Sequence, residues 1–320
     1  MGKAIEQLPS GLTVGHAALG YRGGVPGSVR QQVHDGDTLV VRLLGNLGFR
    51  FLGVDAPEVS FTLPKGKGFV GLSDPRWEKF LTDPFAEEYP PFQPPLQPSF
   101  RKRLKSRSGA GTALNHSRHA LAAEARLEEE ILKDLQALGQ TEEQFQFFLA
   151  FAREVMDRYG RLLGYVNRFQ PGASTGEERP LSYNERLLSA GLVTPYFIWP
   201  NIDPFRRQGS LIQAVILPGK ANAMAEGDPA LRRARKWVRE ARQKKTGIFD
   251  AADPLRLLPF EVRFLSSRRP PNRWVIDLGR NDDILIDPQK YDSVVNIEDR
   301  LFIAEEYVPL FVQAGWKRKK

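Results

Sequence analysis

Four carboxylates near the start of the chain could together hold a cation, and an arginine lies close to them in the sequence. Asp35 and Asp37 come directly before an apolar run, and Asp55 and Glu58 end the next one. Carboxylates held at short range repel one another by roughly 4 kcal/mol at an effective dielectric constant of 20. A hard divalent cation, which prefers oxygen ligands, would remove that penalty. Arg50 lies in the second apolar run, near the same end.

The residues between these side chains predict the strands that would position them. Thr38–Leu44 and Phe49–Val54 are rich in aliphatic and aromatic residues, and Gly45–Gly48 is typical of a turn. If the two runs pair as a hairpin, the start of one lies beside the end of the other. We therefore expect the acidic residues of both runs to meet at one rim of the sheet.

Composition limits the class of protein. The 320 residues suffice for two domains, and a net charge of +8 favours a polyanionic partner, nucleic acid before an anionic membrane. The absence of cysteine excludes thiol catalysis, disulfides and cysteine-based zinc sites. No apolar run is long enough to span a membrane or to act as a secretory signal. The cytoplasm is the expected location, with a secreted form already trimmed at its start as the alternative.

Residues 60–111 differ in composition from the segments on either side. Prolines occur too densely here for a central strand or a helix interior, so we predict a long insertion on the surface. The insertion ends in a basic run in which Arg101 and Arg103 are candidates for contact with substrate phosphates. The alternative is a surface loop that does not contact the substrate and whose charged side chains are exposed to solvent.

The next segments have clear periodicity. Leucines at helical spacing predict a helix over residues 112–139. His116 and His119 lie three residues apart on it, and without an acidic or cysteine partner on that face we interpret them as packing or surface residues rather than metal ligands. Residues 144–155 and 161–168 predict two strands joined by a turn.

A basic helix follows, and after it comes a second group of predicted strands. Asp228 precedes a helix over residues 230–245 whose surface is rich in Arg and Lys. Beyond it, Phe260–Leu265 and Arg273–Gly279 are predicted to be strands. Residues 254–320 are therefore expected to form a small appended α+β domain, to which the sequence assigns no role.

Three motifs, in this order, resemble those of the staphylococcal nuclease (thermonuclease) family. Asp35–Thr38 resembles its Asp-Gly-Asp-Thr turn, Phe49–Glu58 resembles the strand end that carries its acidic residues, and Asp157–Arg161 is similar to its Tyr-Gly-Arg hairpin. The resemblance covers residues 28–250. It implies a mainly β fold with helices (α+β), a five-stranded OB barrel with three helices. An N-terminal arm, residues 1–27, would precede the barrel.

The resemblance implies hydrolysis of DNA or RNA that depends on Ca²⁺ and leaves 3′-phosphate products. Asp37, Asp55 and the backbone carbonyl of Ala56 would bind the Ca²⁺. Asp35 lies in the same turn as Asp37 and would adjust the properties of the metal ligands without binding the ion itself. The family often has Thr where Ala56 stands, so a hydroxyl contact is missing here.

The resemblance also implies the residues that act on the phosphate. Glu58 would activate the attacking water as a general base, and Arg50 and Arg161 would hold the scissile phosphate and oppose its growing negative charge. Tyr159, in the Tyr-Gly-Arg motif, and Tyr196, in an aromatic segment, would contact the nucleotide.

Each of these residues also has a structural interpretation. Asp37 and Asp55 are of a type common in turns, and Arg50 and Arg161 could belong to structural ion pairs. A second class of function is a catalytically quiet module that binds nucleic acid or protein with the same fold. A third is a scaffold in which the C-terminal segment is the working part. Because the metal carboxylates, Glu58 and both arginines are all present, we expect an active nuclease.

Overall fold

In the computed structural model the chain has a mixed α+β fold with more helix than strand, about 39% against 22%. The α+β class is confirmed, whereas the expectation of a mainly β chain is wrong. The structure describes residues 3–8, 10, 13–35, 38–157, 159–170, 180–202 and 209–319.

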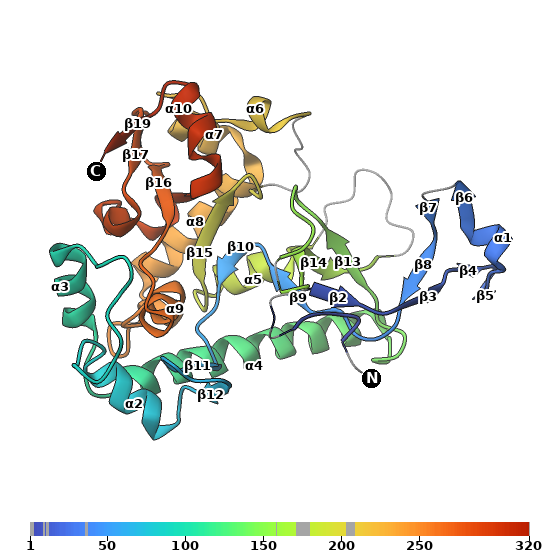
Figure 1. Ribbon diagram of the computed structural model, residues 1–320, viewed down its shortest axis with the longest axis horizontal. Helices are drawn as coiled ribbons and strands as arrows, with labels where there is room; N and C mark the ends of the chain where they lie inside the picture. The colour runs from blue at the N-terminus through green and yellow to red at the C-terminus, as the bar shows by residue number, and fades with distance from the viewer. Residues whose placement is uncertain are drawn as a thin grey trace.

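A mixed six-stranded sheet lies at the centre of the fold, with the strand order β10-β15-β18-β16-β17-β19 (Figure 1). β18 pairs in parallel with β15 and antiparallel with β16. Residues 254–320, expected as an appended domain, thus share one sheet with β10 and β15. The strands are β10 (Gly53–Asp55), β15 (Thr194–Trp199), β16 (Arg273–Asp277), β17 (Ile284–Ile286), β18 (Arg300–Ala304) and β19 (Lys317–Lys319).

A second sheet has the order β13-β14-β9, with β13 (Phe147–Ala150), β14 (Leu162–Arg168) and β9 (Phe49–Phe51). β13 and β14 are antiparallel, which confirms the predicted pair of strands, and β14 runs parallel to β9. The sheets formed by the described residues are not closed into a barrel, so the OB barrel is not confirmed.

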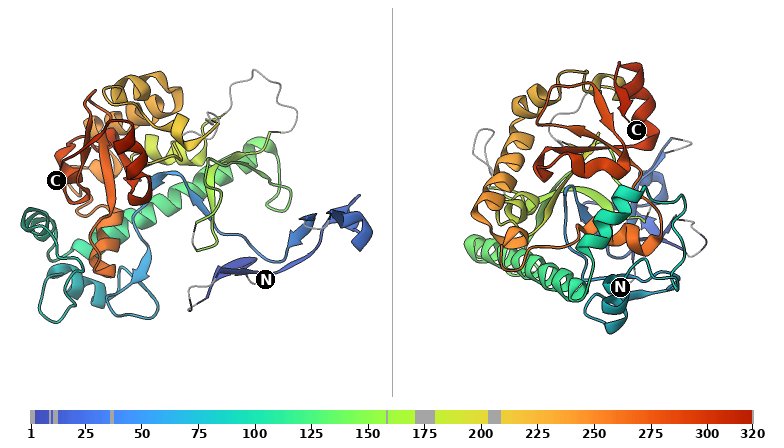
Figure 2. Two further views of the ribbon diagram at one scale, coloured as in Figure 1. Left: turned by 45° about the horizontal axis from the view of Figure 1, so that its top comes forward. Right: turned by 90° about the vertical axis from the view of Figure 1, so that its left-hand side faces the viewer.

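The first residues form an arm of short strand pairs that projects from the body of the molecule (Figures 1 and 2). β8 pairs with β3 rather than with β9, so the expected hairpin between the two apolar runs is wrong. β6 and β7 lie at the far end of the arm from β10 (Figure 1). The strands of the arm are β1 (Ile5–Gln7), β2 (Thr13–Gly15), β3 (Ala17–Leu19), β4 (Tyr21–Arg22), β5 (Val25–Pro26), β6 (Val33–Asp35), β7 (Thr38–Leu39) and β8 (Val41–Leu43).

Helices cover both faces of the central sheet and create two cores. Along β15 the side chains alternate: Phe197 and Trp199 enter one core with α5, α7, α8 and α10, whereas Tyr196 enters the other with α2, α3 and α9. The long helix α4 passes along the edge of the molecule (Figures 1 and 2). The helices are α1 (Val29–Gln32), α2 (Pro75–Thr82), α3 (Pro98–Arg107), α4 (Thr112–Leu138), α5 (Tyr183–Ser189), α6 (Leu211–Ala214), α7 (Ala221–Gly227), α8 (Pro229–Lys244), α9 (Pro259–Ser267) and α10 (Val308–Gln313).

The proline-rich segment 60–111 is part of the core, so its prediction as a surface insertion is wrong. It forms β11 (Ser60–Thr62), β12 (Phe69–Gly71), α2 and α3. Trp77 and Phe80 of α2 are fully buried in the same cluster as Phe260 of α9. Proline at the start of a helix is compatible with this because the first N–H groups of a helix have no partner within it.

α9 replaces the strand predicted over Phe260–Leu265. Pro259 opens the helix, and the carboxylate of Glu261 accepts a hydrogen bond from the N–H of Leu258 at 2.7 Å. Phe260, Val262 and Leu265 are buried against the sheet. A short run of apolar residues fits either a strand or a buried helix, and here the residues that cap the helix favour the helix.

The helices predicted over residues 112–139 and 230–245 are confirmed as α4 and α8. α4 ends at Gly139, which has a left-handed backbone with φ of 61°. α8 begins after Asp228, whose carboxylate accepts a hydrogen bond from the N–H of Leu231 at 2.9 Å.

Asp228→Ala is expected to lower the free energy of unfolding by about 1 kcal/mol because the N–H of Leu231 loses its cap. Urea denaturation followed by circular dichroism measures the change. Asp228→Asn, whose side-chain oxygen can still cap, is the matched control and should stay close to the wild type. Equal losses in both variants would contradict the capping role.

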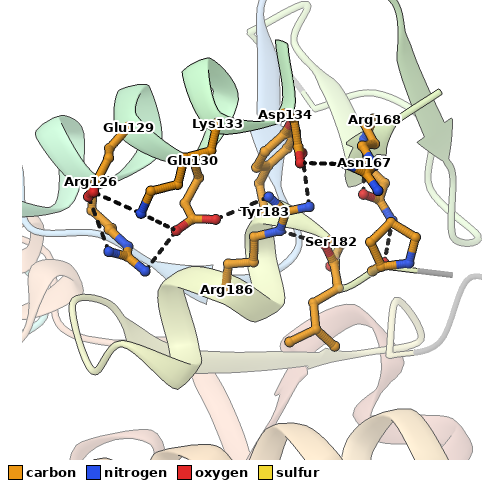
Figure 3. A network of polar contacts seen from close by, with 12 residues as sticks. Arg126, Glu129, Glu130, Lys133, Asp134, Asn167, Arg168, Ser182, Tyr183 and Arg186 are labelled. Carbon is orange, nitrogen blue, oxygen red and sulfur yellow. Dashed lines mark hydrogen bonds and ion pairs between the residues drawn. The ribbon is translucent and has the colours of Figure 1, made fainter. Parts of the chain in front are cut away.

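Buried ion pairs join α4 to α5 and β14 (Figure 3). The guanidinium of Arg186 contacts Glu130 Oε2 at 3.1 Å and Asp134 Oδ2 at 2.9 Å. Arg168 contacts Asp134 Oδ1 at 3.0 Å, and the hydroxyl of Tyr183 donates to Asp134 Oδ2 at 2.8 Å. Asp134 is therefore the point at which three elements meet.

Candidate functional site

Three of the predicted catalytic and metal-binding residues come together where β9 passes into β10. Arg50 Nη2 lies 3.0 Å from Asp55 Oδ1, five positions further along the chain. Gly53, the first residue of β10, has φ of 75°, and a Cβ atom there would lie 2.9 Å from the hydroxyl of Tyr165. A glycine is needed at this bend. It lets the arginine of one strand reach the carboxylate that ends the next.

Asp55 and Glu58 share a partner that the sequence analysis missed. Arg263, on α9, places Nη2 2.7 Å from Asp55 Oδ2 and Nη1 2.6 Å from Glu58 Oε1. Asp55 is nearly inaccessible, with its side chain 1% exposed, whereas the side chain of Glu58 is 23% exposed. One guanidinium thus spans both carboxylates at the edge of the site.

His116 supports this cluster from α4. Its Nε2 accepts a hydrogen bond from the backbone N–H of Glu58 at 2.8 Å. Burial lowers the pKa of His116 to about 3, and the charge of Arg263 adds to that shift. His116 is therefore neutral at physiological pH and positions the backbone of Glu58, as expected for a packing residue rather than a metal ligand.

Burial also shifts the acidic and basic groups of the cluster. It raises the pKa of Glu58 above its ordinary value of 4.5; Arg263 opposes this shift and the neighbouring Asp55 adds to it. Burial works against the charge of Arg263, but Asp55 and Glu58 outweigh it and raise the pKa of this guanidinium. Arg263 is thus a permanent cation beside a carboxylate that is protonated more easily than usual.

Arg161 directly precedes the neighbouring strand β14 and has a different partner. Leu162 pairs with Phe49, and Leu163 pairs with Arg50, so Arg161 lies next to the start of β9. Its guanidinium contacts Asp157 Oδ2 at 2.7 Å and is 39% exposed. Arg161 is adjacent to the cluster in the sheet without touching it.

The remaining predicted metal-site residues are Asp35, Asp37 and Ala56. Asp37 lies outside the described residues. Asp35 ends β6 in the arm, and its side chain is also outside the described part. Ala56 follows β10 directly and is exposed. Of the predicted Ca²⁺ ligands, the structure therefore places Asp55 and Ala56 at the cluster.

The two tyrosines predicted to contact substrate differ in accessibility. Tyr159 is exposed in the turn before β14, and the guanidinium carbon of Arg161 lies 5.4 Å from the centre of its ring. Tyr196 is buried in β15 and stacks on Phe260 with ring centres 5.3 Å apart. Its hydroxyl accepts a hydrogen bond from Arg273. Tyr159 is therefore accessible from solvent, whereas Tyr196 is a core residue.

The two arginines predicted to bind phosphate on α3 also differ. Arg101 is exposed, with its guanidinium carbon 5.1 Å from the centre of the Phe85 ring. Arg103 contacts the fully buried Glu261 at 2.9 Å and Asp292 at 3.1 Å. Arg103 therefore neutralises a buried carboxylate of α9, and Arg101 remains available at the surface.

The described residues do not fit a divalent cation at Asp55. Both of its carboxylate oxygens accept from guanidinium groups, and one oxygen of Glu58 does the same. Within the part of the chain that the structure describes, no group of three or more His, Asp or Glu could hold a metal ion. A Ca²⁺ ion there would need these oxygens released, with backbone carbonyls or water molecules as its remaining ligands.

Comparison with models of known protein families, with curated proteins and with solved structures gives no match. In the described ranges, no helix is both long and apolar enough to cross a membrane. The resemblance to the staphylococcal nuclease family therefore remains a prediction from three motifs, and the function has to be argued from the cluster itself.

Proposed function

We propose that the chain hydrolyses phosphodiester bonds of nucleic acid, as a nuclease similar to those of the staphylococcal nuclease family. One observation carries the proposal: Arg50, Asp55 and Glu58, which the sequence motifs single out, lie in one connected cluster. The parallel pairing of β14 with β9, which brings Arg161 beside the same strand, supports it.

In this reaction Glu58 acts on water. Arg263 holds Oε1, and Oε2 has no hydrogen-bond partner among the described residues, so that oxygen can accept the proton of a water molecule. The water oxygen bonds to phosphorus, and the bond from phosphorus to the 5′ oxygen breaks. The released 5′ oxygen takes a proton from solvent to become a hydroxyl, and the other product keeps a 3′-phosphate. Arg50 and Arg161 oppose the negative charge that grows on the phosphate oxygens.

A polyanionic substrate suits the surface of the chain. The net charge is +8, and α8 exposes Arg232, Arg233, Lys236 and Lys244. Such charges attract DNA or RNA without reading its sequence. The proposal extends to an OB-type unit built around β13, β14 and β9, and to action in the cytoplasm.

A catalytically quiet module that binds nucleic acid or protein is the second candidate function. Arg263 favours it, because this residue neutralises the two carboxylates that a metal-dependent nuclease would need free. The described residues give no fit for Ca²⁺, so the mechanism proposed above includes no step through a metal ion.

Incubation of the purified protein with plasmid DNA, single-stranded DNA and RNA separates the two candidates. Each substrate is tested with Ca²⁺, with Mg²⁺ and with a chelator, and product ends are identified by labelling. The nuclease proposal expects fragments with 3′-phosphate ends that the Arg50→Ala variant does not produce. Substrates that stay intact under all conditions, but shift in a gel with the protein, would instead establish the binding module.

A further inference from the structure

Arg263 occupies the position between Asp55 and Glu58 that a bridging metal ion would need. The planar guanidinium donates to one oxygen of each carboxylate, at 2.7 Å and 2.6 Å. This fork geometry suits two acceptors better than a single ammonium group would. Asp55 receives a second guanidinium, from Arg50, on its other oxygen.

The charges of the cluster are already balanced. Asp55 and Glu58 contribute two negative charges when ionised, and Arg50 and Arg263 contribute two positive ones. A divalent cation between the carboxylates would add two further positive charges at short range from both guanidinium groups. In a poorly solvated site such like charges repel strongly, so an ion could bind there only if Arg263 left.

Arg263 is anchored against leaving. Val262 and Leu265, on the same helix, are fully buried, and Phe260 stacks on Tyr196 of the central sheet. The hydroxyl of Ser266 donates to the carbonyl of Thr62. The core therefore fixes the backbone of Arg263, and withdrawal of its guanidinium would break the hydrogen bonds to both carboxylates.

We propose that Arg263 is the resident cation of this site and closes the Asp55–Glu58 pair to divalent ions. The proposal departs from the Ca²⁺ site that the sequence motifs imply. It concerns binding of the ion rather than cleavage, and so it holds or fails independently of the nuclease activity.

Equilibrium dialysis with Ca²⁺ tests the proposal on the full chain. The wild type, Asp55→Asn and Glu58→Gln should bind the same amount of Ca²⁺, because neither carboxylate holds the ion when Arg263 is present. Arg263→Gln, which frees one oxygen of each carboxylate, should bind one additional Ca²⁺ per chain. The Arg263→Gln, Asp55→Asn double variant should lose that ion.

Two outcomes would overturn the proposal. One is a wild type whose Ca²⁺ binding falls when Asp55 or Glu58 is neutralised. The other is a folded Arg263→Gln variant that gains no ion. Circular dichroism establishes whether Arg263→Gln folds, and if it does not, the comparison of the wild type with Glu58→Gln still decides. A protein that cleaves nothing, but shows the expected binding pattern, would remove the proposed function and leave this inference intact.

Discussion

Glu58→Gln is expected to slow cleavage of DNA or RNA by about 10²–10⁴-fold, because the neutral amide cannot take the proton of the attacking water. The variant keeps the size of the side chain and an oxygen that can accept from Arg263, so the fold should be retained. The effect is measured as the initial rate of cleavage of a labelled oligonucleotide, with the same fraction of wild type and variant bound to substrate. Glu124→Gln, on the exposed side of α4, is the matched control and should cut at the wild-type rate.

The dependence of this reaction on pH follows from the same residue. General-base catalysis needs ionised Glu58, and burial raises the pKa of this carboxyl above 4.5. The rate should therefore fall as the pH is lowered through a value above 4.5, and this acidic limb should disappear in Glu58→Gln. A variant that cuts as fast as the wild type at every pH would remove Glu58 from the mechanism.

The local part of the cluster could be predicted from the sequence because it depends on short-range geometry. Arg50, Asp55 and Glu58 lie within nine positions of one another, and the strand character of their neighbours is strong. Arg263 could not be predicted, since it is 205 residues from Glu58 and lies on a segment whose apolar run also fits a strand. The capping residues Pro259 and Glu261 were the available signal for a helix there.

Proline content alone mispredicts residues 60–111, because proline is favourable at the first turn of a helix as well as in surface loops. Pro75 and Pro98 each stand at the first turn of a helix, where proline is favourable. The aromatic residues that follow, such as Trp77 and Phe80, are those of a core. Their partner Phe260 belongs to α9, so the burial depends on contacts that no local pattern contains.

The shared sheet also depends on long-range pairing. β18 fits between β15 and β16 because Leu301 and Ile303 face one core while Phe302 faces the other. A continuous apolar run of this kind predicts a strand with two buried faces, but it does not specify which strands lie beside it. The expected domain boundary at residue 254 depends on the order of the segments along the chain. That order does not reveal that strands on both sides of the boundary pair in one sheet.

Asp134→Ala is expected to lower the free energy of unfolding by about 3–5 kcal/mol, the usual cost of removing one partner from a buried ion pair. The side chain of Asp134 is 7% exposed and lies between the guanidinium groups of Arg168 and Arg186 (Figure 3). Without it, Arg168 loses its carboxylate and Arg186 keeps only Glu130. The two partly buried guanidinium groups would then have one neighbouring anion fewer.

Tyr183 makes the loss larger than a count of charges suggests. Burial and the charge of Asp134 raise the pKa of this phenol, which therefore stays neutral and donates its proton to Asp134. In Asp134→Ala the hydroxyl would be left without that acceptor in a poorly solvated place. Chemical denaturation measures the change, and Glu129→Ala, on the exposed face of the same helix, should leave the stability almost unaltered. If both variants unfold at the same denaturant concentration as the wild type, the network in Figure 3 does not hold α4 to α5 and β14.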